Sequence, residues 1–599
     1  MCGIVGYIGE KQASPVLLDG LSKLEYRGYD SAGIAVYDGS KINIEKSKGR
    51  LKVLSDLIDG GKKLKGTCGI GHTRWATHGE PSDVNSHPHT NKVGNIAIVH
   101  NGIIENYMKL KTYLISKGYE FVSETDTEVI AHLADYYYKG DIIDTVIKII
   151  NKVEGSYALG IISSEHPDEI IAVRKDSPLI VGLGDGENYI ASDIPAILKY
   201  TKNVYLIDDN EIAVLKKSGV TLYNTDKEVI EKEVFEVNWD IQSAEKGGYE
   251  HFMFKEIMEE PIGIANTVNP IIKQGLIKFD KIPKKLHIVA CGSAYHVGVV
   301  GKYVIEKLAK IPVEVDIASE YRYRDPLLTE DTLVVIISQS GETADTLAAL
   351  RDSKKRGAKI FGIVNVVGSS IARESDEVLY TLAGPEIAVA TTKAYSTQLT
   401  AIYLLALSLA KANGNLSAEE EKAYCDELMR LPDYVSDMIK QKEKIQYYAS
   451  RFYNSKSVFF IGRGLDYAIS LEGSLKLKEI SYIHSEAYGA GELKHGTISL
   501  IEDGTLVVAL ATQDALYEKT MSNIKEVKAR GAVVLAITED GHYNIEETSD
   551  AVLYIPKTNP LFTPSLAVTL LQLFAYYVAS LKGCDIDKPR NLAKSVTVE

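Results

Sequence analysis

The feature that most constrains the fold of this chain is a repeat in its C-terminal part. A strand leading to a glycine turn, a strand followed by a helical pattern, and an uncharged helix each occur twice in the same order. The paired positions are Ala290 and Ile461, Leu333 and Leu506, and Lys411 and Lys582, at separations of 171, 173 and 171 residues. Nearly constant separations over three patterns indicate two copies of one structural unit.

Each copy alternates short β-rich runs with helical patterns, which predicts a parallel sheet covered by helices on both faces. We expect one α/β copy at residues 251–425 and a second at 426–585, with a linker at 241–250 and a C-terminal tail at 586–599. The chain has 599 residues, too many for one hydrophobic core, so residues 1–240 are expected to form a separate domain.

Residues 1–240 show a different pattern. Short apolar runs recur between Gly, Asp and Asn residues, which favours antiparallel strands joined by turns. Helical patterns lie between some of these runs, at residues 14–26 and 127–137. The sequence therefore predicts an α+β domain in which sheets are packed between helices.

Two uncharged stretches, residues 394–410 and 564–581, are nearly long enough to cross a bilayer. Both contain Gln, Thr and Ser, and both occupy the same place in the repeat. We therefore predict that they are helices buried in a globular core, and we expect no membrane contact. The net charge of −14, with no basic stripe to offset it, argues against a nucleic-acid partner.

The five cysteines lie far apart in the sequence, without a CxxC pair. This predicts neither a disulfide framework nor a cysteine-ligated metal, and it favours a reducing compartment. No basic, apolar leader precedes the first strand, so we expect a cytoplasmic protein.

Cys2 directly follows the initiator methionine in the run MCGIVGYIG. One interpretation is a first strand that happens to contain a cysteine. The other is that Met1 is removed, which leaves Cys2 with a thiol and a free α-amine. That amine has a reference pKa of about 7.7–8.0 and can act as the base for the thiol at neutral pH. The thiolate would attack a carbonyl, and Asn101 with the backbone N–H of Gly102 would stabilise the resulting oxyanion.

The motifs MCGIVGYIG, EYRGYDSAGIAV, GHTRWATHG, HNGIIEN and SETDTEV together resemble the glutaminase domain of class II glutamine amidotransferases, which are N-terminal nucleophile enzymes with αββα layers. The resemblance covers the whole first domain and implies that Cys2 attacks the side-chain amide of glutamine and releases ammonia. It also implies that Arg74 binds the substrate α-carboxylate and Asp126 its α-amine. Arginine suits the first role because it binds carboxylates in a bidentate manner.

The same resemblance assigns the lining of the glutamine pocket. Trp75 would gate the exit, and Thr77 and His78 would line the pocket. His72 and His87, in the same polar segment, are interpreted as core or loop-anchoring histidines without a catalytic role.

In the first repeat copy, the segment SQSGETADT follows the apolar strand LVVII and opens a helix. Three hydroxyl side chains and a glutamine surround Gly341, which permits close approach to the backbone. A helix N-terminus favours an anion, so the segment predicts a phosphate site rather than an ordinary Ser/Thr helix cap. The residues assigned to it are Ser338, Gln339, Ser340 and Thr343, with Ser293 added from the neighbouring loop.

The second copy differs at the corresponding positions. Ala511, Thr512, Gln513 and Asp514 stand where the first copy has its Ser-Gln-Ser-Gly run. Most hydroxyls are lost, and a carboxylate stands where an anion would bind, which is electrostatically unfavourable. We therefore expect one phosphate site per chain.

A helical pattern in the second copy carries Glu472, Lys476 and Glu479 at spacings that place them on one face, while Lys478 points elsewhere. One interpretation is a solvated ion-pair face. A glycine-rich stretch at 489–491 instead favours a site, because it lets chain segments approach closely. An aldose–ketose isomerisation needs a base of this kind to move a proton between adjacent carbons.

This C-terminal part, from the phosphate loop to the tail, resembles the isomerase domain of the glutamine:fructose-6-phosphate amidotransferases (glucosamine-6-phosphate synthases), which is built from two sugar isomerase (SIS) subdomains. The resemblance implies that glutamine-derived ammonia aminates fructose 6-phosphate and that the product is isomerised to glucosamine 6-phosphate, without a metal or organic cofactor. The implied roles are proton transfer by Glu479, assistance by Lys476, ring opening by His495, a Schiff base at Lys594, and pocket lining by the backbone near Val389.

The family is dimeric, which implies a homodimer in which His495 reaches the sugar site of the neighbouring chain. One departure from the family pattern is Ala294, where a second hydroxyl residue often follows the Cys-Gly turn. The loss of one hydrogen bond there is worth about 1 kcal/mol, and it leaves Ser293 and the Ser-Gln-Ser loop to hold the phosphate.

Two other functions stay open on sequence grounds. A class II amidotransferase with a different phosphosugar acceptor would keep the Cys2 site. A non-enzymatic sugar-phosphate sensor built on SIS modules would need neither Glu479 nor Lys594. This hypothesis does not explain why a cysteine stands at position 2.

Overall fold

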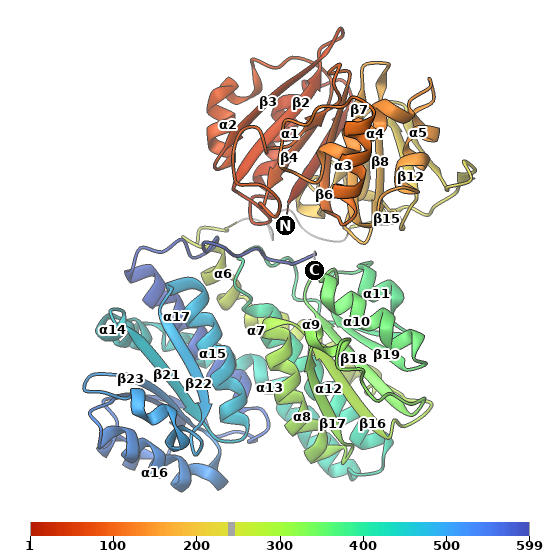
Figure 1. Cartoon of the computed structure of the whole chain (residues 1–599). Helices are drawn as coiled ribbons and strands as arrows, with labels where there is room; N and C mark the ends of the chain where they lie inside the picture. The colour runs from red at the N-terminus through yellow and green to blue at the C-terminus, as the bar shows by residue number, and fades with distance from the viewer. Residues whose placement is uncertain (1, 238–245, 598–599) are drawn as a thin grey trace. The chain divides into compact units, whose positions relative to one another are not determined.

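The computed structural model describes residues 2–237 and 246–597. The chain divides into two compact units, one grouping Met1–Ala244 with Ala593–Glu599 and the other comprising Glu245–Leu592 (Figure 1). Within the predicted linker, residues 241–245 lie outside the described residues, as do the last two residues of the predicted tail.

The N-terminal unit is built on two sheets in which every registered strand pair is antiparallel, as the sequence predicts. One sheet has the order β15 (Phe235–Glu236), β11 (Asn203–Leu206), β9 (Ile180–Leu183), β10 (Asn188–Ala191), β1 (Gly3–Ile8), β4 (Cys68–Arg74), β2 (Ser31–Tyr37), β3 (Ile42–Lys48). The other has the order β14 (Val229–Ile230), β13 (Gly219–Tyr223), β12 (Ile212–Lys216), β8 (His166–Lys175), β7 (Gly155–Ser163), β6 (Ile96–Ile104), β5 (His89–Thr90).

The two sheets pack face to face between helices, which confirms the αββα layers. Apolar side chains of β1 and β4 meet those of β6, β7, β8 and β12 in one buried cluster between the sheets. Helix α1 (Ala13–Ser22) covers β1 and β4 from outside. Helices α3 (Tyr107–Ser116), α4 (Glu128–Tyr137) and α5 (Ile142–Ile150) form a second core with the other sheet.

The second unit contains two five-stranded parallel sheets with the same strand order, which confirms the predicted repeat. The first has the order β17 (Val313–Ile317), β16 (Lys285–Ala290), β18 (Thr332–Ser338), β19 (Lys359–Val364), β20 (Glu377–Tyr380). The second has the order β22 (His484–Gly489), β21 (Ser457–Gly462), β23 (Leu506–Ala511), β24 (Val533–Glu539), β25 (Ala551–Ile555).

Helices cover these sheets and join the two copies in one continuous core. Helix α13 crosses the expected boundary between residues 425 and 426, and it packs against α7 and α17, so that boundary falls inside a helix that both copies share. The longer helices are α6 (Phe252–Met258), α7 (Glu260–Gln274), α8 (Gly292–Leu308), α10 (Ala344–Lys355), α12 (Lys393–Ala412), α13 (Ala418–Lys440), α14 (Lys442–Phe452), α15 (Leu465–Ser481), α16 (Tyr517–Lys528) and α17 (Thr563–Leu581).

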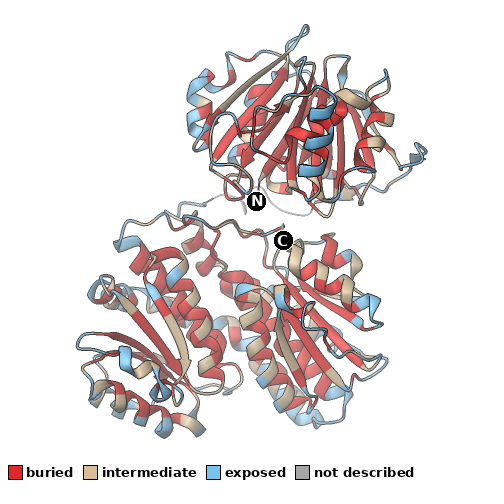
Figure 2. Cartoon of the chain, viewed as in Figure 1, coloured by how far each residue is buried: buried red, intermediate tan, exposed pale blue. Residues whose placement is uncertain are grey.

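The two uncharged stretches lie within α12 and α17, and both are inside the fold, as predicted. Helix α17 is long and apolar enough to cross a membrane, but 83% of its apolar window is buried against the rest of the protein. It packs against α13, α14 and α15, and α12 packs against α7 and α8. Figure 2 shows the burial of each residue in the same view as Figure 1. The apolar character of α12 and α17 therefore serves the core that joins the two copies.

Candidate active site

Cys2 directly precedes β1, a central strand of its sheet, and is half-buried. Its Sγ accepts a hydrogen bond from the backbone N–H of Trp75 at 3.2 Å. Burial raises the pKa of the thiol, and the Trp75 N–H and the guanidinium of Arg74 only partly oppose this effect. A thiol in this environment needs a nearby base to become a nucleophile.

Asn101 and Gly102 lie on β6, and the structure brings Asn101 to Cys2. The Asn101 side-chain Nδ2 donates to the backbone oxygen of Cys2 at 2.9 Å. Gly102 has φ +123°, and a Cβ at this position would lie 2.1 Å from the backbone oxygen of Ser156. Only glycine fits there, so the backbone can present its N–H beside Asn101.

Arg74 and Asp126 supply one positive and one negative charge to the same region, and both are buried. Arg74 donates from Nη2 to the backbone oxygens of His78 and Gly79, while its Nη1 is buried without a hydrogen-bond partner in the described structure. An Asp126 carboxylate oxygen accepts from the N–H of Ile104 at 2.8 Å. Burial lowers the pKa of Arg74, partly opposed by Cys2 and Asp126. A ligand carboxylate would satisfy the unpaired guanidinium nitrogen.

The other predicted pocket residues follow Arg74 in one loop. Asp30 anchors this loop by accepting the N–H of Ala76 at 2.9 Å. The Trp75 ring packs edge-on against that of Tyr29, with centroids 5.8 Å apart. Thr77 is exposed and His78 half-buried, which leaves both accessible to a small ligand.

Four buried histidines lie behind this site. The His72 and His87 rings stack with centroids 4.1 Å apart, and His87 also lies near the rings of His89 and His100. Burial lowers the pKa of all four, to about 3 for His72. They are therefore neutral at physiological pH.

We expect acid to destabilise the N-terminal unit because of these histidines. In the unfolded chain a histidine binds a proton below pH about 6.5, whereas the folded group does not, so the free energy of unfolding falls as the pH drops from 6.5 towards the folded value. His72, with a folded pKa of about 3, lowers this free energy by about 1.4 kcal/mol at pH 5.5. Calorimetry at pH 7.5 and 5.5 should show the unfolding transition of this unit move to lower temperature, and His87→Phe should reduce the shift. An equal shift in both proteins would contradict this assignment.

The predicted phosphate loop joins β18 to α10. Ser338 ends the strand, and its Oγ accepts the N–H of Gly341 at 3.1 Å and lies 3.1 Å from the hydroxyl of Thr343, which caps α10. Gly341 has φ +65°, and a Cβ would lie 2.0 Å from the Oγ of Ser369. The loop thus gathers hydroxyls and backbone N–H groups at a helix N-terminus, with no room for a side chain at its centre.

Gly341→Ala is expected to raise the KM for the sugar phosphate by about 10-fold or more, because a left-handed alanine costs about 1 kcal/mol and its methyl would displace Ser369. Gly357→Ala is the matched control, since Gly357 follows the other end of α10 with φ +84° and open space around it. Steady-state kinetics with varied sugar phosphate measure both. Equal KM changes in the two variants would contradict the loop's role.

In the second copy the corresponding donors are already occupied by the chain itself. The buried carboxylate of Asp466, in the first turn of α15, accepts both the backbone N–H of Thr512 at 2.9 Å and its hydroxyl at 2.5 Å. Burial raises the pKa of Asp466 to about 6. Asp514, the residue that suggested the loss of this site, is exposed and pairs with His542.

Helix α15 carries Lys476 between two carboxylates. Its Nζ donates to Glu479 at 2.6 Å and lies 3.5 Å from Glu472. Lys476 and Glu472 are 1% and 0% exposed, which rules out a solvated ion-pair face, whereas Lys478 is exposed. Burial alone would lower the pKa of Lys476, but Glu479 and Glu472 outweigh it and raise the pKa. The charge on Lys476 is therefore held by its neighbours.

Glu472 also connects α15 with the first copy, which the sequence did not reveal. Its carboxylate accepts from the hydroxyl of Ser293 at 2.9 Å and lies 2.8 Å from Nδ1 of His296. Both residues belong to α8, so Ser293 lies in the first turn of a helix and not in the preceding loop. His296 and Glu472 are 176 residues apart in the sequence, so no local sequence pattern predicts this contact.

The remaining predicted residues lie in separate segments. His495 ends a short 3₁₀ turn and is exposed. The N–H of Val389 donates to the backbone oxygen of Asp587 at 3.0 Å. Glu256, a buried side chain absent from the sequence-based predictions, accepts the N–H groups of residues 387 and 388 and so fixes this loop. Lys594 is half-buried and belongs to the segment grouped with the N-terminal unit.

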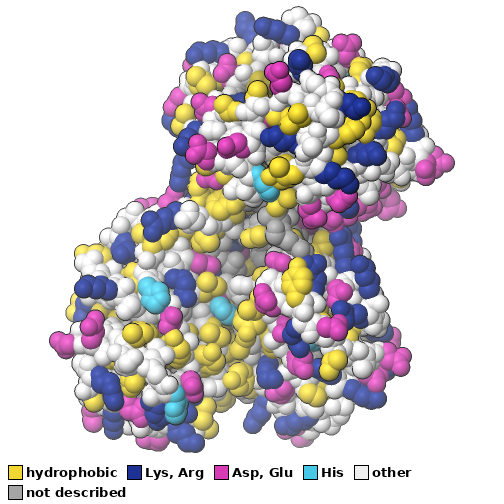
Figure 3. Space-filling view, viewed as in Figure 1, with side chains coloured by type: hydrophobic (Ala, Val, Ile, Leu, Met, Phe, Trp, Pro, Cys, Tyr) yellow, Lys and Arg dark blue, Asp and Glu magenta, His cyan; other side chains and the backbone are white. Residues whose placement is uncertain are grey.

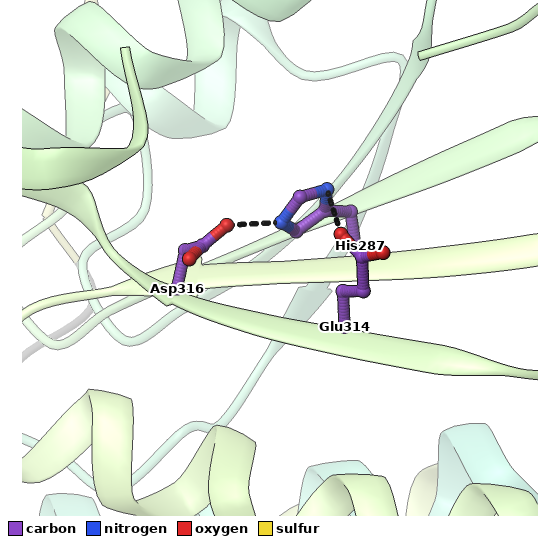
Figure 4. A group of neighbouring side chains, drawn as sticks. All are labelled: His287, Glu314 and Asp316. Carbon is purple, nitrogen blue, oxygen red and sulfur yellow. Dashed lines mark hydrogen bonds and ion pairs between the residues drawn. The ribbon is translucent and has the colours of Figure 1, made fainter. Parts of the chain in front are cut away.

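One further group of side chains, His287, Glu314 and Asp316, has the composition of a metal site and also contacts an arginine. His287 lies between Asp316, at 2.5 Å, and Glu314, at 3.8 Å (Figure 4). The guanidinium of Arg324 contacts all three residues, at 2.5 to 3.2 Å from the nearest atoms. This guanidinium supplies the positive charge, so we assign the group to an ion-pair network.

Comparisons with known proteins agree with both halves of this description. Residues 59–239 match the model of the glutamine amidotransferase domain, and residues 282–408 and 451–582 each match that of the SIS domain. Proteins named glutamine–fructose-6-phosphate aminotransferase (isomerizing) from Caldanaerobacter subterraneus subsp. tengcongensis and Clostridium acetobutylicum are 61% and 59% identical to this chain over the full length of both. The C-terminal domain of glucosamine-fructose-6-phosphate aminotransferase from Francisella tularensis aligns with a TM-score of 0.55 and 42% identity, covering 58% of this chain and all of that one.

Proposed function

Because the chain belongs to the isomerizing glutamine–fructose-6-phosphate aminotransferases, we propose that its two units divide that reaction between an ammonia-releasing site at Cys2 and a sugar-phosphate site in the repeat. Glutamine is the nitrogen donor and fructose 6-phosphate the acceptor, and the products are glutamate and glucosamine 6-phosphate. The observation that carries the proposal is the half-buried Cys2, whose backbone oxygen accepts a hydrogen bond from Asn101, together with the unpaired guanidinium nitrogen of Arg74.

At the first site, the thiol proton of Cys2 passes to the α-amine of Cys2 itself, which removal of Met1 leaves free. The thiolate then attacks the side-chain carbonyl of glutamine. Asn101 Nδ2 and the N–H of Gly102 stabilise the oxyanion. As the protonated α-amine returns this proton to the amide nitrogen, collapse of the intermediate breaks the C–N bond, releases ammonia and leaves a thioester that water hydrolyses to glutamate. Arg74 binds the substrate α-carboxylate and Asp126 its α-amine. Trp75, Thr77 and His78 complete the pocket.

At the second site, the phosphate binds the loop after β18 and His495 opens the ring. Lys594 condenses with the sugar carbonyl to a Schiff base with loss of water, and ammonia then displaces the lysine from this imine. Glu479 moves the proton between adjacent carbons, and Lys476 assists. The backbone at Val389 lines the pocket. The phosphate ligands in this scheme are Ser293, Ser338, Gln339, Ser340 and Thr343.

Asp466 supports a single phosphate site per chain, because it fills the anion position of the second copy.

The scheme includes a homodimer in which His495 serves the sugar site of the partner subunit, and a cytoplasmic location without metal or organic cofactor. The domains are residues 1–240, 251–425 and 426–585, with the linker 241–250 and the tail 586–599. Lys and Arg side chains are interspersed with Asp and Glu on the face in Figure 3, in keeping with small-molecule substrates rather than nucleic acid.

The test is incubation of the full chain with glutamine and fructose 6-phosphate, with glutamate and glucosamine 6-phosphate assayed separately. Formation of both in equal amounts is expected. Glutamate without the amino sugar would favour a different phosphosugar acceptor, and absence of both products would favour a sugar-phosphate sensor.

A further inference from the structure

His72 lies on β4 opposite Asn101, and it touches this residue and not the nucleophile. Its Nε2 lies 3.0 Å from the side-chain oxygen of Asn101 and 3.0 Å from the backbone oxygen of His100. His72 is fully buried, two residues before Arg74 on the same strand face. It therefore connects one sheet to the residue of the other sheet that faces Cys2.

The two oxygens around Nε2 fix the protonation of the ring. A backbone carbonyl oxygen only accepts hydrogen bonds, so Nε2 must carry the hydrogen. Nδ1 is buried without a hydrogen-bond partner in the described structure, and the ring stacks on His87. A second proton on Nδ1 would place a charge in a buried site with nothing to accept it. The ring is thus a neutral imidazole with one donor.

This donor determines which way the Asn101 amide faces. With the side-chain oxygen on His72, Nδ2 donates to the backbone oxygen of Cys2 at 2.9 Å. In the reversed amide, Nδ2 would face the N–H of His72, and the amide oxygen would face the Cys2 carbonyl oxygen. Both hydrogen bonds would be replaced by repulsive contacts, so the reversed state is strongly disfavoured.

We infer that His72 is a positioning residue for ammonia release, which holds the Asn101 amide by its oxygen so that its N–H groups face Cys2 and the oxyanion. It transfers no proton, because its only N–H is directed at two acceptors away from the thiol. The inference rests on the proposed oxyanion role of Asn101. If Asn101→Ala leaves the kcat for glutamine hydrolysis unchanged, that role fails whatever His72 does.

The test compares His72→Phe with His72→Gln in the full chain. The Phe variant keeps a planar ring but has no donor, and we expect it to lower the kcat for glutamine hydrolysis by about 10- to 100-fold with little change in KM. The Gln variant places an N–H near the position of Nε2 and should restore most of the kcat. His87→Phe, which alters the other ring of the stack without a contact to Asn101, should leave the kcat unchanged.

Alkylation of Cys2 by iodoacetamide separates positioning from general damage, because this displacement forms no oxyanion. Its rate should be the same in all these variants. An unchanged kcat in His72→Phe, an equal loss in His72→Gln, or a parallel loss of alkylation would each overturn the inference. Should His72→Phe fail to fold, ¹⁵N NMR of the unmodified protein at pH 7 tests it directly: a neutral ring with its proton on Nε2 is expected, and a proton on Nδ1 would overturn it.

Discussion

Replacing Cys2 by alanine is expected to lower glutamine-dependent formation of the amino sugar by roughly 10⁴-fold or more, because no other side chain at this site can form the thioester. Isomerisation of the sugar phosphate should be unchanged, because its proposed groups lie in the repeat and in the C-terminal tail and do not include Cys2. Separate assays of glutamate release and sugar isomerisation measure the two effects. The Arg74 and Asp126 side chains would still bind glutamine without turning it over.

Cys68→Ala is the matched control for this variant. Cys68 is a free, buried cysteine on β4, and in the strand register it lies opposite Ile8, at the other end of β1 from Cys2. The Cys68→Ala substitution therefore removes a thiol from the same sheet without changing the site. It should retain glutaminase activity. Labelling of a side chain other than Cys2 by an electrophilic glutamine analogue, or glutaminase activity in protein that mass spectrometry shows to retain Met1, would contradict the assignment.

The features that sequence alone predicts are those that repeat or that lie close together along the chain. The duplicated unit follows from three spaced patterns, and two parallel sheets of identical strand order confirm it. The shared face of Glu472, Lys476 and Glu479 follows from helix geometry, and the contacts of Lys476 confirm it. The burial of α12 and α17 follows from their place in the repeat and their few polar residues.

The features that sequence reasoning missed depend on contacts between distant segments. The sequence predicts a core histidine at His72, which its burial supports, but the contact of His72 with Asn101 depends on how two sheets face each other. The sequence places Glu472 on a helix face, but its contacts with α8 require the two copies to pack together. Asp466 carries no motif at all, yet it occupies the donors of Thr512. Such contacts are set by packing, which no local pattern encodes.

The second large effect is expected at Glu479, for which Glu479→Gln should lower the rate of sugar isomerisation by roughly 10²- to 10⁴-fold. Glutamine keeps the shape of the side chain but cannot accept a proton from the sugar carbon. It also removes the nearer of the two carboxylates around Lys476, which leaves Glu472 at 3.5 Å as the remaining partner. Glutamate release at Cys2 should be unaffected.

Lys478→Gln is the matched control, because Lys478 lies next to Glu479 on the same helix, is exposed, and faces away from Lys476. The measurement is exchange of the substrate's carbon-bound hydrogen with deuterated solvent, followed by NMR, which reports proton transfer even when no product accumulates. Exchange should be nearly lost in Glu479→Gln and normal in Lys478→Gln. If exchange persists in Glu479→Gln, another group moves the proton, and the assignment of Glu479 as the base is wrong.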